Sequence, residues 1–254
     1  GEGAVAAGVG AALAEGDLLA QRGSSIGPAL ARGVGARGVM AELLGKSAGP
    51  CRGKGGRGHL ACPDAGFFGA HAVVGGNLSV AAGVALAARH ERRPAAVVCL
   101  FGDGACGSGA LHETLNLAAL WALPLVLVCD NNQYSVSTPV REALAPERLA
   151  DLAGPFGVPG RSVDGMDAVA VRDAARELTA RARAGDGPSL LECVSYRFST
   201  HSTLTRETRP AEELHRWRER CPVRRLSERL LADGVLDGPS LDRLRHEAER
   251  EAED

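Results

Sequence analysis

The sequence has few aromatic residues, no long apolar run and no excess of charge of either sign. Phe, Trp and Tyr make up 4% of the 254 residues, so Ala, Val and Leu must fill most of the core, which a chain of this length can bury. No run of about 18 apolar residues is present, which argues against a membrane span. The formal net charge of −2 gives no field that would favour nucleic acid. No signal peptide is evident.

The cysteines lack the spacing of a metal site or a disulfide framework. There are seven, an odd number without a C-x-x-C pair, so we expect no zinc site. Cys99, Cys129 and Cys193 stand in apolar, strand-like runs, which suggests buried thiols in a reducing, cytoplasmic compartment. Two nucleotide-binding motifs are missing as well. No G-x-G-x-x-G follows a strand-like run and no P-loop lysine motif occurs, which disfavours a nicotinamide site.

Apolar runs alternate with helical periods along the chain. Residues 95–101, AAVVCLF, form a continuous apolar run that predicts a strand buried on both faces. Helical periodicity over 109–121 and the apolar run 125–129 complete a βαβ unit, which implies parallel strands. Further strands are expected at 160–165 and 188–196, and helices at 3–14, 79–90 (capped by Asn77 or Ser79) and 167–184. We therefore predict an α/β fold, with a mostly parallel central sheet and helices on both faces.

The composition divides the chain near residue 206. Residues 45–78 are rich in glycine, and an irregular loop of that length is usually functional. From residue 206 the sequence is charged and helical, with alternating signs that argue against a nucleic-acid face. We expect one domain over residues 1–205 and a C-terminal extension of three short surface helices over 206–254.

Two polar turns stand at the ends of the predicted βαβ unit. Gly102-Asp103-Gly104 follows the first strand and Asn131-Asn132 follows the second. Ligands of open α/β sheets bind beyond the carboxyl ends of strands, so we expect Asp103 and Asn132 in one crevice. Carboxylate and amide oxygens suit Mg²⁺ or Ca²⁺, with phosphate oxygens completing the shell, and a helix N-terminus near Ser108 favours phosphate. A lone Gly-Asp-Gly usually marks only a turn; the pair favours metal-bridged diphosphate binding.

These motifs resemble a known family. The stretch FGDGACGSGALHETLNLAALWALPLVLVCDNNQYSVSTPV is similar to the alpha subunit of the pyruvate-dehydrogenase-type decarboxylating component of 2-oxo acid dehydrogenases. The segments GAHAVVGGNLSVAAGVALA and SYRFSTHS resemble it too, in order, from residue 1 to about 250. Compared with that family, the chain lacks some tens of N-terminal residues and a short tail. The resemblance implies the thiamine-diphosphate-binding fold, with thiamine diphosphate and Mg²⁺ as cofactors.

The resemblance also assigns roles to individual residues. The side chains of Asp103 and Asn132 and the backbone carbonyl of Tyr134 would hold Mg²⁺. His201 matches the active-site loop histidine, which positions or protonates the cofactor-bound intermediate. The residues that would contact the cofactor are Ala72 (at a position usually Gly), Val74, Gly102, Gly104, Ala105 and Arg197.

The chain departs from the family in two segments. The family usually has Tyr-Arg-x-His-Gly before the Arg-Gly found here at 32–33, but residues 23–27 read Gly-Ser-Ser-Ile-Gly. Arg22 lies one position before this segment and is an alternative source of the positive charge that the family arginine supplies. In the second segment, His-Gly-His-Ser has become Ser-Thr-His-Ser at 199–202. Losing a charge-assisted phosphate contact costs about 1.5–3 kcal/mol of binding free energy. The site could therefore bind the cofactor more weakly, or it could be rebuilt for another substrate; both alternatives stay open.

The resemblance implies half of an active site. In the family a beta subunit supplies the glutamate that activates the cofactor, and no candidate for it is found in this chain, so we expect an α₂β₂ heterotetramer. The small-residue helices at 3–14 and 79–90 are candidate packing surfaces. The implied reaction is decarboxylation of a 2-oxo acid with transfer of the acyl unit to a lipoyl protein. Two alternatives stay open: transfer of a two-carbon unit from a ketose or 2-oxo acid to an acyl-carrier protein, and a non-catalytic paralogue. Neither nucleic acid nor membrane is expected as a partner.

Overall fold

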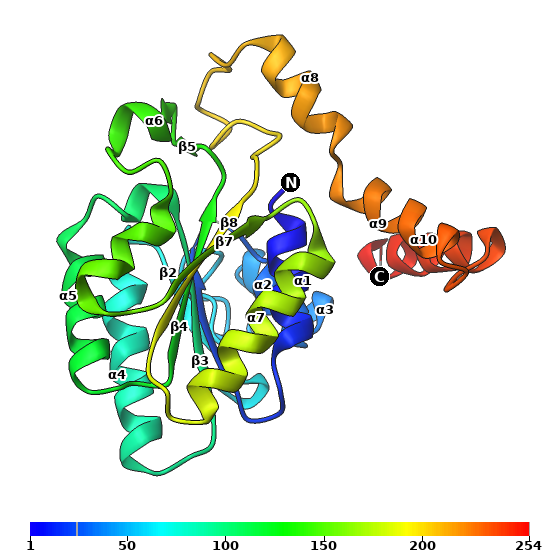
Figure 1. Cartoon of the computed structure of the whole chain (residues 1–254). Coiled ribbons are helices and arrows are strands. Elements are labelled where there is room, and N and C mark those ends of the chain that lie inside the picture. The colour runs from blue at the N-terminus through cyan, green and yellow to red at the C-terminus, as the bar shows by residue number, and fades with distance from the viewer. Residues whose placement is uncertain (24, 254) are drawn as a thin grey trace.

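The computed structural model describes residues 1–23 and 25–253 (Figure 1). Within them, the central sheet has six strands in the order β2-β1-β3-β4-β8-β7, and every neighbouring pair is parallel. The strands are β1 (Leu18–Arg22), β2 (Phe67–His71), β3 (Val97–Gly102), β4 (Leu125–Asn131), β7 (Gly160–Asp164) and β8 (Ser189–Val194). A short antiparallel pair, β5 (Tyr134–Ser135) with β6 (Thr138–Pro139), follows β4. The predicted α/β class is confirmed.

Helices cover both faces of the sheet (Figure 1). One face carries α4 (Gly76–His90), α5 (Gly109–Leu120) and the 3-10 helix η3 (Leu149–Phe156), and the other carries α1 (Gly3–Ala12), α2 (Gly27–Ala31), α3 (Ala36–Leu43) and α7 (Ala168–Arg183). Strand β3 serves both cores, with Cys99 and Phe101 on the α4–α5 side and Val98 and Leu100 on the α1–α7 side. Burial on both faces is why this strand is a continuous apolar run.

The predicted βαβ unit is β3, α5 and β4, but the side-chain cap predicted for the helix at 79–90 is wrong. Helix α4 begins at Gly76 after Gly75, which has a left-handed φ of 78°, and no side chain in residues 1–23 and 25–253 caps it. Asn77 is instead buried, and its amide donates a hydrogen bond of 2.8 Å to the carbonyl of Leu100. The residue therefore ties α4 to β3.

The two small-residue helices pack differently. A Cβ placed on Gly8 of α1 would lie 2.7 Å from the carbonyl oxygen of Ala168 and 2.8 Å from Cβ of Val171, so only glycine allows α1 to approach α7 this closely. The small-residue face of α1 is thus used inside the chain, and the helix ends at Ala12. In contrast, α4 leaves Val80 and Leu86 exposed.

The described residues after position 206 form three helices, as the sequence predicted. They are α8 (Ala211–Glu219), α9 (Pro222–Ala232) and α10 (Gly238–Glu253). Figure 1 shows them leading away from the carboxyl end of the sheet. Among the described residues, no helix is both long and apolar enough to cross a membrane. The remaining elements are η1 (Pro63–Ala65), η2 (Asp103–Ala105) and α6 (Val140–Ala143).

Candidate functional site

The two predicted polar turns lie at the same edge of the sheet. Strands β3 and β4 are parallel neighbours, and Gly102 pairs with Asp130 at their carboxyl ends. Asp103 and Asn132 follow directly and are 2% and 5% exposed. The backbone N–H of Asn132 faces the carboxylate of Asp103. The structure thus brings together the two side chains that the sequence assigned to one crevice.

The carboxylate of Asp103 is incompletely satisfied by the chain. Its Oδ2 atom is buried and has no hydrogen-bond partner within residues 1–23 and 25–253. Burial raises the pKa of this carboxyl, although the Arg22 charge and the backbone N–H groups of Asp103 and Asn132 oppose the rise. A buried anionic oxygen without a donor is costly unless a cation meets it. The residues therefore fit a bound divalent cation.

The described residues contain no cluster of three His, Cys, Asp or Glu side chains that could hold a metal by themselves. A cation here would take one carboxylate, one amide oxygen and one backbone carbonyl, with further oxygens from its ligand. That donor set suits Mg²⁺ bound together with phosphate, because Mg²⁺ usually keeps water and substrate oxygens in its shell.

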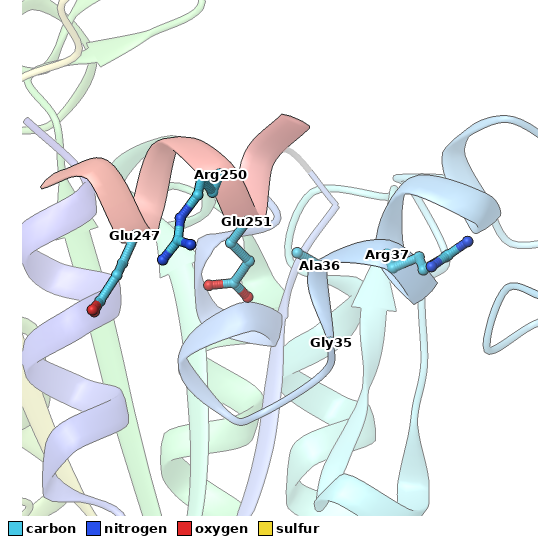
Figure 2. Close-up of a pocket in the computed structure, with 6 residues that line it drawn as sticks. All are labelled: Gly35, Ala36, Arg37, Glu247, Arg250 and Glu251. Atoms are coloured by element: carbon cyan, nitrogen blue, oxygen red, sulfur yellow. The ribbon is translucent and has the colours of Figure 1, made fainter. Parts of the chain in front are cut away.

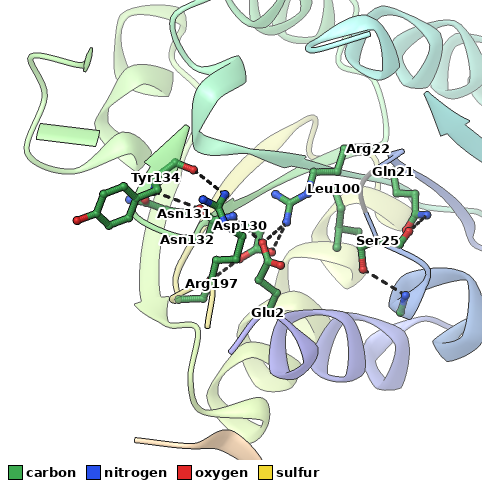
Figure 3. A network of polar contacts seen from close by, with 12 residues as sticks. Glu2, Gln21, Arg22, Ser25, Leu100, Asp130, Asn131, Asn132, Tyr134 and Arg197 are labelled. Atoms are coloured by element: carbon green, nitrogen blue, oxygen red, sulfur yellow. Dashed lines mark hydrogen bonds and ion pairs between the residues drawn. The ribbon is translucent and has the colours of Figure 1, made fainter. Parts of the chain in front are cut away.

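Asn132 and Tyr134 are held by hydrogen bonds at the crevice (Figure 3). The amide oxygen of Asn132 accepts from the backbone N–H of Tyr134 at 3.2 Å, and its Nδ2 donates to Glu2 at 2.6 Å. The carbonyl of Tyr134 accepts from Nη1 of Arg197 at 3.2 Å. Both predicted metal-ligating oxygens thus belong to one network beside Asp103.

The glycines of the Gly-Asp-Gly turn let two polar side chains pack closely against the turn. A Cβ on Gly102 would lie 2.7 Å from Nη1 of Arg22, and one on Gly104 would lie 2.4 Å from Oγ of Ser135. Larger residues at these positions would therefore collide with Arg22 and Ser135. Ala105 is buried, and its side chain packs in the α4–α5 core, so only its backbone can face a ligand.

A buried charge network that sequence reasoning missed lies behind this turn (Figure 3). Nη2 of Arg22, at the end of β1, donates to Glu2 at 2.6 Å and to Asp130 at 2.8 Å. The other carboxylate oxygen of Asp130 accepts from Oγ of Ser195. Burial raises the pKa of Asp130 to about 6, although Arg22 acts to lower it. The available signal was Asp130 itself, a charged residue at the end of an otherwise apolar strand.

Arg197 and His201 occupy the loop after β8. Arg197 donates to the carbonyls of Tyr134 at 3.2 Å and Val136 at 2.5 Å, so it is anchored on the turn after β4. Partial desolvation and the charges of Arg197 and Arg22 lower the pKa of His201, which favours its uncharged form. Both residues line a small cleft with Tyr134 and Val136. The loop thus places a cation and an imidazole beside the turn that carries the Tyr134 carbonyl.

Ala72 and Val74 lie in the turn between β2 and α4. Both are exposed, Val74 by 70%, so neither is part of the core. A Cβ on Gly75 would lie 2.9 Å from Oγ of Ser108, which places this turn against the start of α5. The turn therefore borders the crevice and is accessible to a ligand.

A separate surface groove lies between α3 and α10 (Figure 2). Arg37, Glu247, Arg250 and Glu251 line it together with the backbone near Gly35. These charged side chains are exposed, and their environment gives no sign of a shaped catalytic site.

Comparison with known proteins identifies the family. The family model described as "Dehydrogenase E1 component" matches residues 1–254, the whole chain. The chain belongs to this family. Membership implies thiamine diphosphate as cofactor, and the resemblance predicted from the sequence is confirmed.

The relatives include two types of alpha subunit. The alpha subunit of acetoin:2,6-dichlorophenolindophenol oxidoreductase from Bacillus subtilis is 47% identical over 201 residues, which cover 79% of this chain and 60% of the relative. The alpha subunit of the pyruvate dehydrogenase E1 component from Rhizobium meliloti is 39% identical over 236 residues, covering 92% and 68%. The human mitochondrial somatic form is 35% identical over 226 residues, covering 88% and 57%. The chain thus spans roughly three-fifths of the length of these relatives.

The first departure from the family pattern, at residues 23–27, has a steric explanation in the structure. A Cβ on Gly23 would lie 2.8 Å from the carbonyl oxygen of Gly58, so the tyrosine usual in the family does not fit here on the present backbone. Ser24, where the family arginine is expected, lies outside the described residues. Ser25 accepts a hydrogen bond of 2.6 Å from Gln21 through its carbonyl. The segment is therefore tied to β1, whose last residue, Arg22, places one positive charge beside the Gly-Asp-Gly turn.

Proposed function

We propose that this chain is the alpha subunit of a thiamine-diphosphate- and Mg²⁺-dependent E1 component that decarboxylates a 2-oxo acid and passes the acyl unit to a lipoyl protein. The observation that carries the proposal is the buried Oδ2 of Asp103 beside Asn132, at the carboxyl ends of β3 and β4, which has no hydrogen-bond partner among the described residues. A cation that neutralises this oxygen and bridges to a diphosphate would remove its desolvation cost.

In the proposed site, Asp103, Asn132 and the carbonyl of Tyr134 hold Mg²⁺, while Gly102 and Gly104 let the backbone approach the diphosphate. Bound thiamine diphosphate would supply the carbanion and the electron sink. Ala105 would contribute only its backbone, and Ala72 and Val74 would border the aminopyrimidine.

The active-site loop has a different task. Arg197 would place positive charge near the diphosphate. His201, whose pKa is lowered by desolvation and nearby positive charge, would hold or deliver a proton at the reacting atoms.

A beta subunit is proposed as the partner. The named relatives are alpha subunits, and the crevice of this chain offers no glutamate among the described residues in a setting suited to cofactor activation. We therefore propose that the beta subunit supplies this carboxylate in an α₂β₂ assembly, and that substrate binds between the subunits.

Acetoin is the second candidate substrate. The acetoin oxidoreductase alpha subunit from Bacillus subtilis has higher identity to this chain than the pyruvate dehydrogenase alpha subunit from Rhizobium meliloti, 47% against 39%. The altered segments at 23–27 and 199–202 keep a third possibility open, transfer of a two-carbon unit from a ketose or 2-oxo acid to an acyl-carrier protein.

The co-purified complex with its beta subunit tests these alternatives. Pyruvate, longer 2-oxo acids, acetoin and a ketose are offered in turn, with 2,6-dichlorophenolindophenol as electron acceptor and then with a lipoyl domain or an acyl-carrier protein. Dye reduction and lipoyl acylation with a 2-oxo acid are expected. Turnover of acetoin alone would select the second candidate. A complex that binds thiamine diphosphate but turns over none of these donors would favour the non-catalytic paralogue.

A further inference from the structure

A buried carboxylate lies behind the turn that carries two of the proposed metal ligands. Glu192 stands on β8 and is 1% exposed. Asn131, the last residue of β4, pairs with Val194 of the parallel strand β8. Because side chains two positions apart on a strand share one face, Glu192 and Asn131 lie on the same face of the sheet. A charged group buried at such a position needs hydrogen-bond partners.

Each oxygen of this carboxylate accepts a hydrogen bond. Oε1 of Glu192 accepts from Nδ2 of Asn131 at 2.8 Å, and Oε2 accepts from the backbone N–H of Ala150, in η3, at 3.2 Å. A carboxylate can only accept hydrogen bonds. Glu192 therefore fixes the Asn131 amide with its nitrogen toward β8 and its oxygen toward the turn.

The oxygen of the Asn131 amide holds Gln133. It accepts from the backbone N–H of Gln133 at 3.3 Å and from Nε2 at 3.0 Å, and the same Nε2 donates to the Asn131 carbonyl at 3.2 Å. Gln133 has a φ of 74°, a left-handed conformation that residues with a side chain seldom adopt. The hydrogen bonds offset the cost of that conformation, so the turn depends on the orientation of the Asn131 amide.

Gln133 separates two of the proposed ligands. Its neighbours are Asn132 and Tyr134, which would offer an amide oxygen and a backbone carbonyl to the cation (Figure 3). The backbone has only two soft dihedrals per residue, so the φ of Gln133 sets the direction in which the chain continues. A change to negative φ would therefore move these two oxygens relative to each other.

We propose that Glu192 and Asn131 are positioning residues for the metal site. Glu192 orients the Asn131 amide, and that amide holds Gln133 in its left-handed conformation. The oxygens of Asn132 and Tyr134 are thereby in place before the cation binds. Both positioning residues act on the ligands of the metal rather than on the metal itself. This inference rests on the proposed function, because the metal site is part of it.

Reversing the hydrogen-bonding character of the pair tests this proposal. Glu192→Gln keeps the size of the side chain, but its amide nitrogen then faces either the N–H of Ala150 or the amide nitrogen of Asn131. Asn131→Asp alone places two carboxylates against each other. Combining the two substitutions restores the hydrogen bonds, because the new glutamine amide donates to the new aspartate and accepts from Ala150.

Two measurements are made on the assembled complex. Binding of Mn²⁺, a paramagnetic substitute for Mg²⁺, is titrated at saturating thiamine diphosphate by the EPR signal of the free ion. Hydrogen exchange of the backbone amides in residues 131–136 is followed in EDTA, where no metal can order the turn. Asp17→Asn is the matched control: Asp17 is also a buried carboxylate that accepts from two backbone N–H groups, those of Ala14 and Ala96, but at the opposite ends of the strands.

The variants Glu192→Gln and Asn131→Asp should each bind Mn²⁺ at least about tenfold more weakly, since only the fraction of chains with the correct turn binds the ion. Exchange in the turn should be faster in both. The double variant should recover most of the affinity and of the protection. Asp17→Asn should lower the Tm without changing either quantity. Gln133→Ala, at a partly exposed position, leaves the core intact and should also weaken Mn²⁺ binding.

Wild-type affinity for Mn²⁺ in Glu192→Gln or in Gln133→Ala would overturn the proposal. A double variant no better than the single variants would refute it too, because the losses would then come from general disruption of the core. If the wild-type complex binds neither Mn²⁺ nor thiamine diphosphate, the proposed function fails. Exchange in residues 131–136 then still decides whether Glu192 holds the turn, and unchanged exchange in Glu192→Gln would remove that role as well.

Discussion

Asp103 holds a charge that the chain itself does not fully compensate. Its carboxylate is 2% exposed, and one oxygen lacks a donor among the described residues. In the absence of metal, Asp103→Asn should therefore stabilise the fold, because it removes the buried charge whose desolvation raises the pKa of this carboxyl. For a chain of this size each kcal/mol corresponds to a rise in Tm of roughly 2–4 °C. Thermal melting in EDTA measures the change.

The control for this prediction is Asp17→Asn. Asp17 is equally buried but accepts hydrogen bonds from the backbone N–H groups of Ala14 and Ala96 and from Arg183. Removing a paired buried charge typically costs several kcal/mol, so this variant should melt below wild type. A lower Tm for Asp103→Asn as well would show that the chain already satisfies Asp103 without a cation.

Asp130 gives the fold a pH dependence of definite sign. Its folded-state pKa is raised to about 6 from an ordinary value of 3.8, so the ionised side chain destabilises the fold above pH 6, and the penalty disappears as pH falls toward 4. The free energy of unfolding of Asp130→Asn, minus that of wild type, should therefore decrease from pH 6 to pH 4. Urea titrations across this range measure the difference. A difference that is flat, or that grows as pH falls, would contradict the assignment.

At the scale of elements, the parts of the fold with local signals were predictable. Strands β3 and β4 are continuous apolar runs because both of their faces are buried. No comparable pattern marks β1, which ends in Gln21 and Arg22, or β2, which contains Gly69 within a glycine-rich region. Pairing with neighbouring strands, rather than local propensity, makes these two segments extended.

The same distinction applies to the site. Asp103 and Asn132 follow strands of a recognisable unit, so their proximity followed from the topology. Glu2 and Arg22 meet Asp130 only through the folded sheet and α1. No local spacing connects residues 2, 22 and 130, so that network required the structure.

Arg209 joins the active-site loop to the segment that leads into α8. Its side chain is 4% exposed. It donates to the carbonyls of Arg197 and Ser199 and lies 5.5 Å and 5.2 Å from the ring centres of Tyr134 and Tyr196. This one guanidinium thus fixes the loop of His201 against the turn that carries the Tyr134 carbonyl.

Arg209→Met should release that loop. Charge-assisted hydrogen bonds are worth about 1.5–3 kcal/mol, so the rate of protease cleavage within residues 198–206 should rise about tenfold or more. Limited proteolysis followed by mass spectrometry gives the rate. Arg218→Met is the control, since Arg218 is an exposed arginine of α8 and should not alter cleavage in the loop. Equal protection in both variants would remove the role assigned to Arg209.

At the scale of the whole molecule, the crevice opens onto an apolar border. Val73 and Val74 are 64% and 70% exposed beside the start of α4. If the beta subunit completes the site, it should cover this border. Val74→Asp should then weaken association with the beta subunit and cofactor binding together, without changing the Tm of the isolated chain.

Light scattering after size-exclusion chromatography measures the assembly. Val235→Asp serves as the control, because Val235 is 65% exposed in the turn before α10, away from the crevice. An intact heterotetramer with Val74→Asp would place the partner elsewhere.

The central claim is that Asp103 helps to bind a metal-bridged diphosphate, and calorimetric titration of thiamine diphosphate into the assembled complex tests it most directly. Wild type should bind saturably with Mg²⁺ and lose that binding in EDTA. Asp103→Ala should assemble normally but bind at least about a hundredfold more weakly, because one buried charge contact to the cation is lost. Wild-type affinity in Asp103→Ala, or binding that does not depend on metal, would contradict the account.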